Sequence, residues 1–280
     1  MAGVGIVTDS ACDLTADLVQ RSGITVVPLT IRFGDEEFVD RRDLSPAQFW
    51  ARCKAAPVLP ETAAPSPGAF RDAYESAADQ GRDAVLCLTL SAGVSATYQS
   101  ALAAVDHFDR IPVAVVDTRS LTMGQGLLAL AAAEAADAGA DLGRLVDLSA
   151  DGIRRTRVYG VVDTLDHLQR GGRIGGARAL LGSILSIKPV IQVKDGTVAE
   201  ESKQRTRSRS LDYLAAKVRA DAPLDRLAVA NGAAEDIDQF LDRLEGVDVR
   251  HPTVVVDLGP VVGTHAGPGT IGACYLVAEG

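Results

Sequence analysis

Short apolar strands alternate with helical segments through the first half of the chain, and this alternation constrains the fold more than any other feature. β-branched and apolar runs predict buried strands, and helical spacing fills the segments between them. Such an alternation favours a mostly parallel sheet, because each helix carries the chain back to the edge where the next strand starts. The predicted strands are Val4–Thr8, Thr25–Ile31, Ala84–Leu90 and Pro112–Asp117, and the predicted helices are Ala16–Ser22, Ser45–Ala55, Pro67–Asp79 and Ser95–Asp106.

The second half has a different pattern. Two strand-like runs flank Lys194-Asp195-Gly196, and Asp-Gly is a strong signal for a tight hairpin turn. A hairpin among helices predicts a mixed sheet, and a further helix is expected at Leu180–Ile187, before Pro189. The 280 residues are enough for two domains. We therefore predict two α/β domains, at residues 1–155 and 156–280, the first with a mostly parallel sheet and the second with a mixed sheet.

Composition excludes several classes of protein. The net charge of -9 argues against general nucleic-acid binding, which needs an excess of Lys and Arg. The four cysteines form no CxxC pair, and the four histidines show no ligand spacing, so neither a disulfide framework nor a metal site is expected. The N-terminus has no basic leader, and Glu134 interrupts the most apolar helical stretch. We expect a cytoplasmic protein without stable membrane insertion.

Charge is distributed unevenly along the chain. Residues 154–209 hold 12 of the 28 basic residues but only 5 of the 37 acidic ones. Solvated helix faces are one explanation of this basic stretch. A surface for an anion or an acidic partner is the other.

A glycine motif resembles the dinucleotide-binding fingerprint. Gly124-Gln125-Gly126-Leu127-Leu128-Ala129 fits G-x-G-x-x-G/A and opens a helix. The acid that would bind the ribose should follow about 20 residues later at a strand end, whereas the next acids, Glu134 and Asp137, lie on the helix itself. Close packing of helix against strand is therefore the preferred explanation of these glycines.

Gly93-Val94-Ser95-Ala96-Thr97 is close to the G-x-S-x-G nucleophile elbow. His265 follows far downstream, and Asp117 or Asp163 would complete a Ser, Asp, His order, so a serine hydrolase that uses Ser95 and His265 is one hypothesis. However, Ser95 comes five residues after its predicted strand, whereas an elbow lies directly at the turn. The other interpretation makes Ser95 the N-cap of the next helix.

Three further segments are candidates for ligand binding. The densest glycine loop, Gly263–Gly269, contains His265, and its glycines permit close approach to a ligand. The segment Gln169–Gly176 places Arg170 and Arg173 beside Gly171 and Gly172, and guanidinium and backbone N–H groups together bind anions. Thr62 offers a hydroxyl at a strand or loop edge, a weak signal by itself.

Taken together, these segments resemble the DegV family of bacterial fatty-acid-binding proteins, also called FakB, over essentially the whole chain. Their order and spacing carry the resemblance. The matching segments are Thr8-Asp9-Ser10, Thr62-Ala63-Ala64-Pro65-Ser66, the stretch from Ser91 to Ala101, Val116-Asp117-Thr118, Gly124-Gln125-Gly126, the stretch from Leu168 to Ile174, Lys188-Pro189 and the stretch from Gly263 to Gly269.

The resemblance implies a fatty acid held in a tunnel between two α/β domains. Its carboxylate is expected to meet the hydroxyls of Thr62 and Ser95 and the imidazole of His265. The family hands the bound acid to a separate fatty acid kinase that makes an acyl-phosphate, so this chain would have no catalytic residue, no metal and no cofactor besides the bound fatty acid. Arg170 and Arg205 match arginines near the carboxylate or the phosphoryl-transfer surface. Membrane contact would be transient.

This sequence departs from the family pattern at three alanines. Ala63, Ala92 and Ala96 replace two serines and a glycine, which changes the hydrogen bonding available around the head group. Thr62, Ser95 and His265 are retained. A binding protein for another amphiphilic acid is the remaining alternative, and no motif encodes the preferred chain length, unsaturation or branching.

Overall fold

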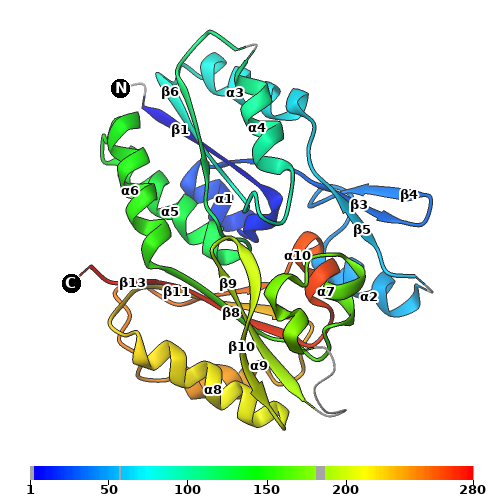
Figure 1. The fold of residues 1–280 in the computed structure, drawn as a ribbon. Coiled ribbons are helices and arrows are strands. Elements are labelled where there is room, and N and C mark those ends of the chain that lie inside the picture. Colours follow the sequence, from blue (N-terminus) through cyan, green and yellow to red (C-terminus); the bar gives the residue numbers. More distant parts are fainter. Residues whose placement is uncertain (1–2, 57, 107, 181–186, 280) are drawn as a thin grey trace.

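The computed structural model describes residues 3–56, 58–106, 108–180 and 187–279. Its strands form three sheets: a four-stranded sheet and a three-stranded sheet from the first half of the chain, and a six-stranded sheet from the second half. In Figure 1 the four-stranded sheet lies above the six-stranded one, and the three-stranded sheet projects to one side. The prediction of two α/β domains with different sheets is confirmed.

The four-stranded sheet is entirely parallel, in the order β2-β1-β6-β7. β1 and β6 are central and bury every residue, which explains their uninterrupted apolar sequence. The strands are β1 (Val4–Asp9), β2 (Thr25–Val27), β6 (Ala84–Thr89) and β7 (Val113–Asp117), and the helices of this half are α1 (Ala16–Ser22), α2 (Pro46–Ala55), α3 (Pro67–Asp79), α4 (Thr97–Val105), α5 (Met123–Asp137) and α6 (Leu142–Arg155), with a 3-10 turn η1 (Ser10–Cys12).

The three-stranded sheet corrects one prediction. The run Thr25–Ile31 is not a single strand, because β2 ends at Val27 and a new strand, β3 (Thr30–Phe33), begins in another sheet. Pro28 lies at the break, where a residue without an N–H cannot continue the ladder. β3 pairs antiparallel with β4 (Glu36–Val39) and β5 (Glu61–Ala63). β5 is the strand that carries Thr62.

The six-stranded sheet is mixed, with the order β10-β9-β8-β13-β11-β12, and only β11 and β12 pair in parallel. The Asp195-Gly196 hairpin joins β9 to β10, as predicted. The expected helix at Leu180–Ile187 falls mainly on residues 181–186, which lie outside the described residues. The elements are β8 (Thr156–Val161), α7 (Asp166–Arg170), the 3-10 turn η2 (Gly175–Leu180), β9 (Lys188–Lys194), β10 (Thr197–Gln204), α8 (Arg207–Ala220), β11 (Leu224–Gly232), α9 (Ile237–Leu244), β12 (Val254–Asp257), α10 (Pro260–Ala266) and β13 (Thr270–Val277).

Helix α5 lies between the two large sheets, where it contacts β1 and β6 on one side and β11 and β13 on the other (Figure 1). Such a position explains why it is apolar on all sides. A Cβ at Gly124 would lie 2.3 Å from Val158 Cγ2, and one at Gly126 would lie 2.6 Å from the carbonyl oxygen of Cys12. These glycines serve close packing rather than dinucleotide binding. We propose residue 155 as the domain boundary, because α6 ends there and the six-stranded sheet begins at Thr156.

Within the described ranges, no helix is both long and apolar enough to cross a membrane. The same residues include no group of three His, Cys, Asp or Glu side chains placed to hold a metal ion.

Candidate functional site

A narrow apolar cavity lies between the two halves of the molecule. Its volume is about 860 Å³ including its opening. The first half contributes Leu29 and Leu90 to its wall, and the second half contributes Val158, Ile191 and Val261. Four polar lining residues are linked, because Thr62 bonds to His265 and Arg173 bonds to the carbonyl of Val94, the neighbour of Ser95. The other polar residues of the lining are Thr122, Tyr159, Gln192 and Thr270. The cavity is therefore mainly apolar, with a polar head formed by Thr62, Ser95, Arg173 and His265.

Two elements from opposite ends of the chain bring Thr62 and His265 together. Thr62 sits on β5, paired with Ile31 of β3, and His265 lies near the end of α10. Thr62 Oγ1 and His265 Nε2 are 3.0 Å apart, a hydrogen bond whose donor depends on the tautomer of the imidazole. Both residues also line a second hollow next to the cavity, which we call the mouth.

Helix α10 corrects the prediction of a glycine loop across 263–269. Residues 260–266 are helical, with Pro260 in the first turn, and only Gly267 and Gly269 have positive φ angles. Gly263 is buried in this helix, and a Cβ there would lie 2.9 Å from ring atoms of both Phe49 and Trp50 of α2. The glycine therefore allows two helices to approach, and His265 is held on a packed element.

Burial sets the charge state of His265. Desolvation lowers the pKa of its imidazole to about 4, and the nearby Arg173 guanidinium and His167 add to the effect. At neutral pH the imidazole is therefore uncharged. Its Nδ1 is buried without a hydrogen-bond partner among the described residues.

Ser95 and Arg173 complete the polar head from the other side. Ser95 Oγ lies 2.9 Å from Thr97 Oγ1 and accepts a hydrogen bond from the Thr97 N–H at 3.3 Å. The interpretation of Ser95 as the N-cap is wrong, because α4 begins at Thr97 and its N-cap is Ala96. The Arg173 guanidinium donates from Nε to the Val94 carbonyl at 3.2 Å and from Nη1 to the Gly171 carbonyl at 2.7 Å. These two bonds tie the arginine to both halves of the molecule.

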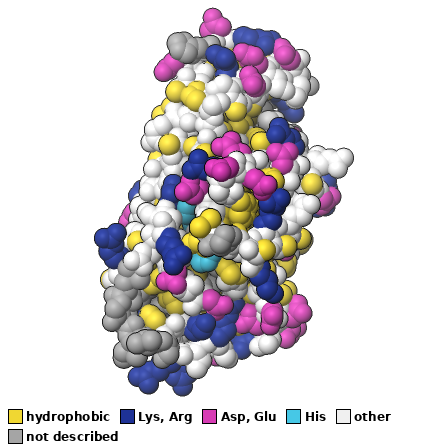
Figure 2. Space-filling model, turned by 90° about the vertical axis from the view of Figure 1, so that its right-hand side faces the viewer, with side chains coloured by type: hydrophobic (Ala, Val, Ile, Leu, Met, Phe, Trp, Pro, Cys, Tyr) yellow, Lys and Arg dark blue, Asp and Glu magenta, His cyan; other side chains and the backbone are white. Residues whose placement is uncertain are grey.

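The loop after α7 forms the outer wall of the mouth. Arg170, the last residue of α7, is exposed and lines the mouth but not the cavity. Gly171 lies against the imidazole, since a Cβ there would be 2.3 Å from His265 Nδ1. Gly172 has a φ of 70° and nothing within 4 Å of its Cβ position. Figure 2 shows exposed histidine atoms beside hydrophobic and basic side chains on one face of the molecule.

Arg205 lies elsewhere. It is exposed between β10 and α8, and it is not among the described residues that line the cavity or the mouth. The structure thus brings together Thr62, Ser95, His265, Arg170 and Gly171, leaves Gly172 at the rim of the loop, and separates Arg205 from them.

The geometry does not support a serine hydrolase. Ser95 bonds to Thr97 and His265 bonds to Thr62, and in the part of the chain that the structure describes no hydrogen bond joins Ser95 to His265. Asp117 accepts from the backbone N–H groups of Ala92 and Arg119, and Asp163 accepts from Lys188 Nζ. Neither acid orients the imidazole, so the catalytic triad is not assembled.

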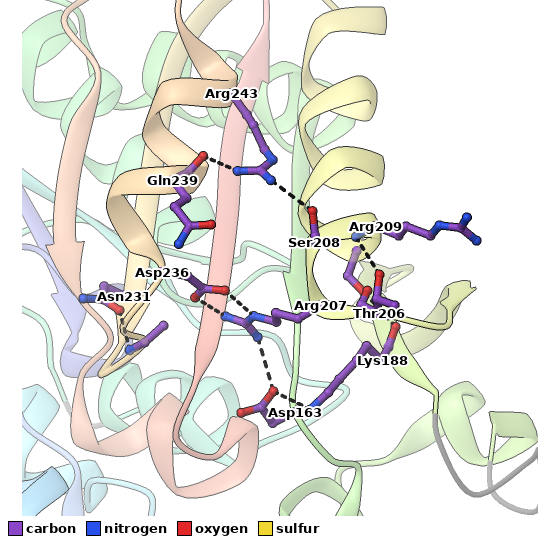
Figure 3. A network of polar contacts seen from close by, with 12 residues as sticks. Asp163, Lys188, Thr206, Arg207, Ser208, Arg209, Asn231, Asp236, Gln239 and Arg243 are labelled. Atoms are coloured by element: carbon purple, nitrogen blue, oxygen red, sulfur yellow. Dashed lines mark hydrogen bonds and ion pairs between the residues drawn. The ribbon is translucent and has the colours of Figure 1, made fainter.

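A polar network supports the segment that follows α10 (Figure 3). Arg207 makes two hydrogen bonds of 2.9 Å to Asp236 and lies 3.6 Å from Asp163, which also accepts from Lys188 Nζ at 2.9 Å. Gly269 adopts a φ of 78° beside Asp163, where a Cβ would be 2.3 Å from Oδ2. The network therefore joins the end of β8, the start of β9 and the starts of α8 and α9 next to the turn between His265 and β13.

A family model decides the assignment of this fold. The model of the DegV family, described as a family of uncharacterised proteins, matches residues 3–278. The chain belongs to the DegV family. The DegV domain-containing protein of Streptomyces coelicolor is 39% identical over 277 residues, which is 96% of each chain.

Solved structures of DegV proteins share the whole fold. A fatty-acid-binding DegV family protein from Thermus thermophilus has a TM-score of 0.91 at 31% identity, covering 99% of this chain and 100% of its own. A stearic acid-binding protein from Eubacterium ventriosum has a TM-score of 0.87 at 26% identity, covering 98% of both chains.

Sequence reasoning placed Arg173 of this DegV protein in the anion-binding segment Gln169–Gly176 but did not assign it to the carboxylate. Arg173 lines both the cavity and the mouth, whereas the sequence alone favoured Arg170, three residues earlier in the same glycine-rich segment. The ending of α7 decides between them, because it leaves Arg170 exposed at the helix end and lets the chain turn back with Arg173. A two-arginine motif in a loop contains no signal that separates the two.

Proposed function

We propose that this chain binds a long-chain fatty acid, with the acyl group in the apolar cavity and the carboxylate at Thr62, Ser95, Arg173 and His265. The observation that carries the proposal is the union of an apolar channel with four hydrogen-bonding side chains. The fatty-acid-binding DegV proteins of the same fold support it.

The apolar and polar parts of the lining would contribute differently to fatty acid binding. Burying about 15 methylenes contributes roughly 12 kcal/mol before the costs of association, at about 0.8 kcal/mol each. Each charge-assisted hydrogen bond to the carboxylate contributes about 1.5–3 kcal/mol. Apolar burial would therefore provide most of the affinity, and Thr62 and His265 would fix the orientation of the acid.

We further propose that this protein presents the carboxylate to a separate fatty acid kinase in the cytoplasm and carries out no catalysis itself. The exposed Arg170 beside the mouth supports this role, because a cation there would stabilise negative charge on the phosphoryl group during transfer. The basic stretch 154–209, which contains Arg170, would form part of the surface for the partner.

Mass spectrometry of the purified protein tests binding. Under native conditions we expect one added mass equal to a fatty acid, which disappears on denaturation and is reduced in Thr62→Ala/Ser95→Ala. An added mass that matches another amphiphilic acid would replace the fatty acid in this proposal. A protein that is empty and takes up no added fatty acid would refute it.

A coupled assay with the fatty acid kinase tests presentation. We expect Arg170→Glu to reduce acyl-phosphate formation while fatty acid affinity stays within about twofold, because this side chain lines only the mouth. Arg144→Glu, an exposed change on α6, is the matched control and should alter neither. Equal loss of binding and transfer in Arg170→Glu would contradict the role at the transfer surface.

A further inference from the structure

The apolar cavity shares four lining residues with a second, polar pocket, and none of these four lines the mouth. Strands β8 and β9 pair at three positions, from Val161 with Val190 to Tyr159 with Gln192. Beyond these, β8 continues along β13 and β9 continues along β10, and the described strands make no further pairs with each other. The two strands therefore diverge where Val158 faces Val193.

A separate pocket opens at this divergence. Its volume is about 970 Å³ including its opening. Its walls are the start of β8, the end of β9, the segment after β7 and the end of α6. Val158, Tyr159, Gln192 and Val193 line both this pocket and the apolar cavity. The two spaces thus adjoin at these four residues, and we call the second one the tail pocket.

The tail pocket is basic, in contrast to the cavity beside it. Arg119, Arg154, Arg157 and Lys194 line it, against a single acidic residue, Asp195. Asp195 pairs with Arg119 at 3.0 Å, and Asp151, outside the pocket, pairs with Arg154 at 2.8 Å. Among the described residues, the Arg157 guanidinium donates only to carbonyls, those of Arg154 and Thr156 at 2.9 and 3.0 Å. The lining therefore has excess positive charge beside an apolar channel, on an otherwise acidic protein.

Two further observations indicate a binding role. Ser120 is 3% exposed and lines the tail pocket, and its hydroxyl has no hydrogen-bond partner in the described structure. A buried hydroxyl without a partner is costly unless a ligand or water completes it. Arg119 and Thr122, on either side, have φ angles of 51° and 47°, which are unfavourable for residues other than glycine. Strain of this kind concentrates at ligand sites.

We infer that the tail pocket binds an anionic group at the far end of the acyl chain, so that the protein accepts α,ω-dicarboxylic acids. This inference rests on the proposed fatty acid site, because the first carboxylate would occupy the head of the cavity. The second carboxylate would emerge at the β8–β9 divergence, within reach of Ser120, Arg157 and Lys194. A closed apolar end would instead exclude such an acid, since an unpaired buried carboxylate is strongly unfavourable.

Calorimetric titration of the delipidated protein tests the inference with monocarboxylic and dicarboxylic acids of matched, increasing length, at a pH at which both carboxylates are ionised. The chain that spans the cavity should bind as a dicarboxylic acid within about tenfold of the monocarboxylic acid. Arg157→Gln/Lys194→Gln should weaken the dicarboxylic acid by roughly tenfold and the monocarboxylic acid by less than about twofold. Added salt should weaken the dicarboxylic acid more.

The outcomes separate the two proposals. Lys203→Gln, an exposed lysine on β10 outside the tail pocket, is the matched control and should change neither affinity. Dicarboxylic acids that bind more than about a hundredfold more weakly than monocarboxylic acids at every length would overturn the tail pocket alone. Equal weakening of both acids in the double variant would also overturn it. Failure of every monocarboxylic acid to bind would instead refute the proposed fatty acid site.

Discussion

Substitution of Gly171 by alanine tests whether the loop after α7 fixes the imidazole at the head of the cavity. The backbone tolerates the change, because Gly171 has a φ of -73°. The new methyl group does not fit, since its Cβ would lie 2.3 Å from His265 Nδ1 and 3.0 Å from the His167 carbonyl oxygen. Ordinary contacts of a Cβ begin near 3.4 Å, so the ring or the loop must move by roughly 1 Å.

A movement of that size would disrupt the polar side chains at the head of the cavity. The Thr62–His265 hydrogen bond is 3.0 Å long, and a further 1 Å or so exceeds hydrogen-bond range. Loss of one charge-assisted bond to the carboxylate costs about 1.5–3 kcal/mol, which corresponds to a fatty acid affinity lower by about tenfold to a hundredfold. Overpacking should also lower the free energy of unfolding by about 1–3 kcal/mol.

Calorimetric titration with palmitic acid measures the affinity, and NMR titration of the imidazole reports its pKa. We expect the pKa of His265 in Gly171→Ala to rise from about 4 toward the ordinary value of 6.5, because displacement from the packed site restores solvation. Urea unfolding measures the stability of the same samples.

Gly152→Ala is the matched control. Its Cβ would lie 2.6 Å from Leu128 Cδ2, a comparable collision where α6 packs against α5, outside the cavity and the mouth. This variant should lose stability without losing affinity. A Gly171→Ala protein with unchanged affinity and an unchanged His265 pKa would refute the argument that this loop holds the imidazole in place.

Three further predictions follow from single contacts. Thr62→Val should weaken fatty acid binding by roughly tenfold in the same titration, because the near-isosteric side chain loses the hydroxyl that bonds His265, and an unchanged affinity would contradict this. Gly93→Ala should lower the melting temperature, since its Cβ would lie 2.7 Å from the carbonyl oxygen of Gly196 in the β9–β10 turn. An unchanged melting temperature in calorimetry would show that contact with this turn does not stabilise the protein. Burial raises the pKa of Asp13 from 3.8 in the unfolded chain to about 7. The protonated carboxyl therefore contributes stability that is fully present below pH 3.8 and is lost as pH rises through 7, by up to about 1.4 kcal/mol per pH unit. Asp13→Asn should remove that slope from urea unfolding curves, and parallel pH profiles for the two proteins would show that it has no such effect.

Local patterns predicted much of the fold. The strands of the parallel sheet could be predicted from the sequence because β1 and β6 are buried on both faces. The hairpin could be predicted because Asp195-Gly196 suits a tight turn. The break of Thr25–Ile31 into two strands was also encoded locally, in Pro28, but its destination in a different sheet was not. That destination depends on β5, which lies about 30 residues later and pairs with β3.

The sequence by itself determined the two α/β halves, the family resemblance and three of the side chains at the head of the cavity, Thr62, Ser95 and His265. The two halves follow from periodicity, which is a property of neighbouring residues. The three side chains were implied by the family resemblance, which the order of motifs along the chain carries. The tertiary structure alone decided that α10 is a helix, that Arg173 enters the cavity, and that a basic pocket adjoins it. The reason is physical: these features arise where β5, α10 and the β8–β9 divergence meet, and contacts between segments far apart in the chain leave no periodic signal in either one.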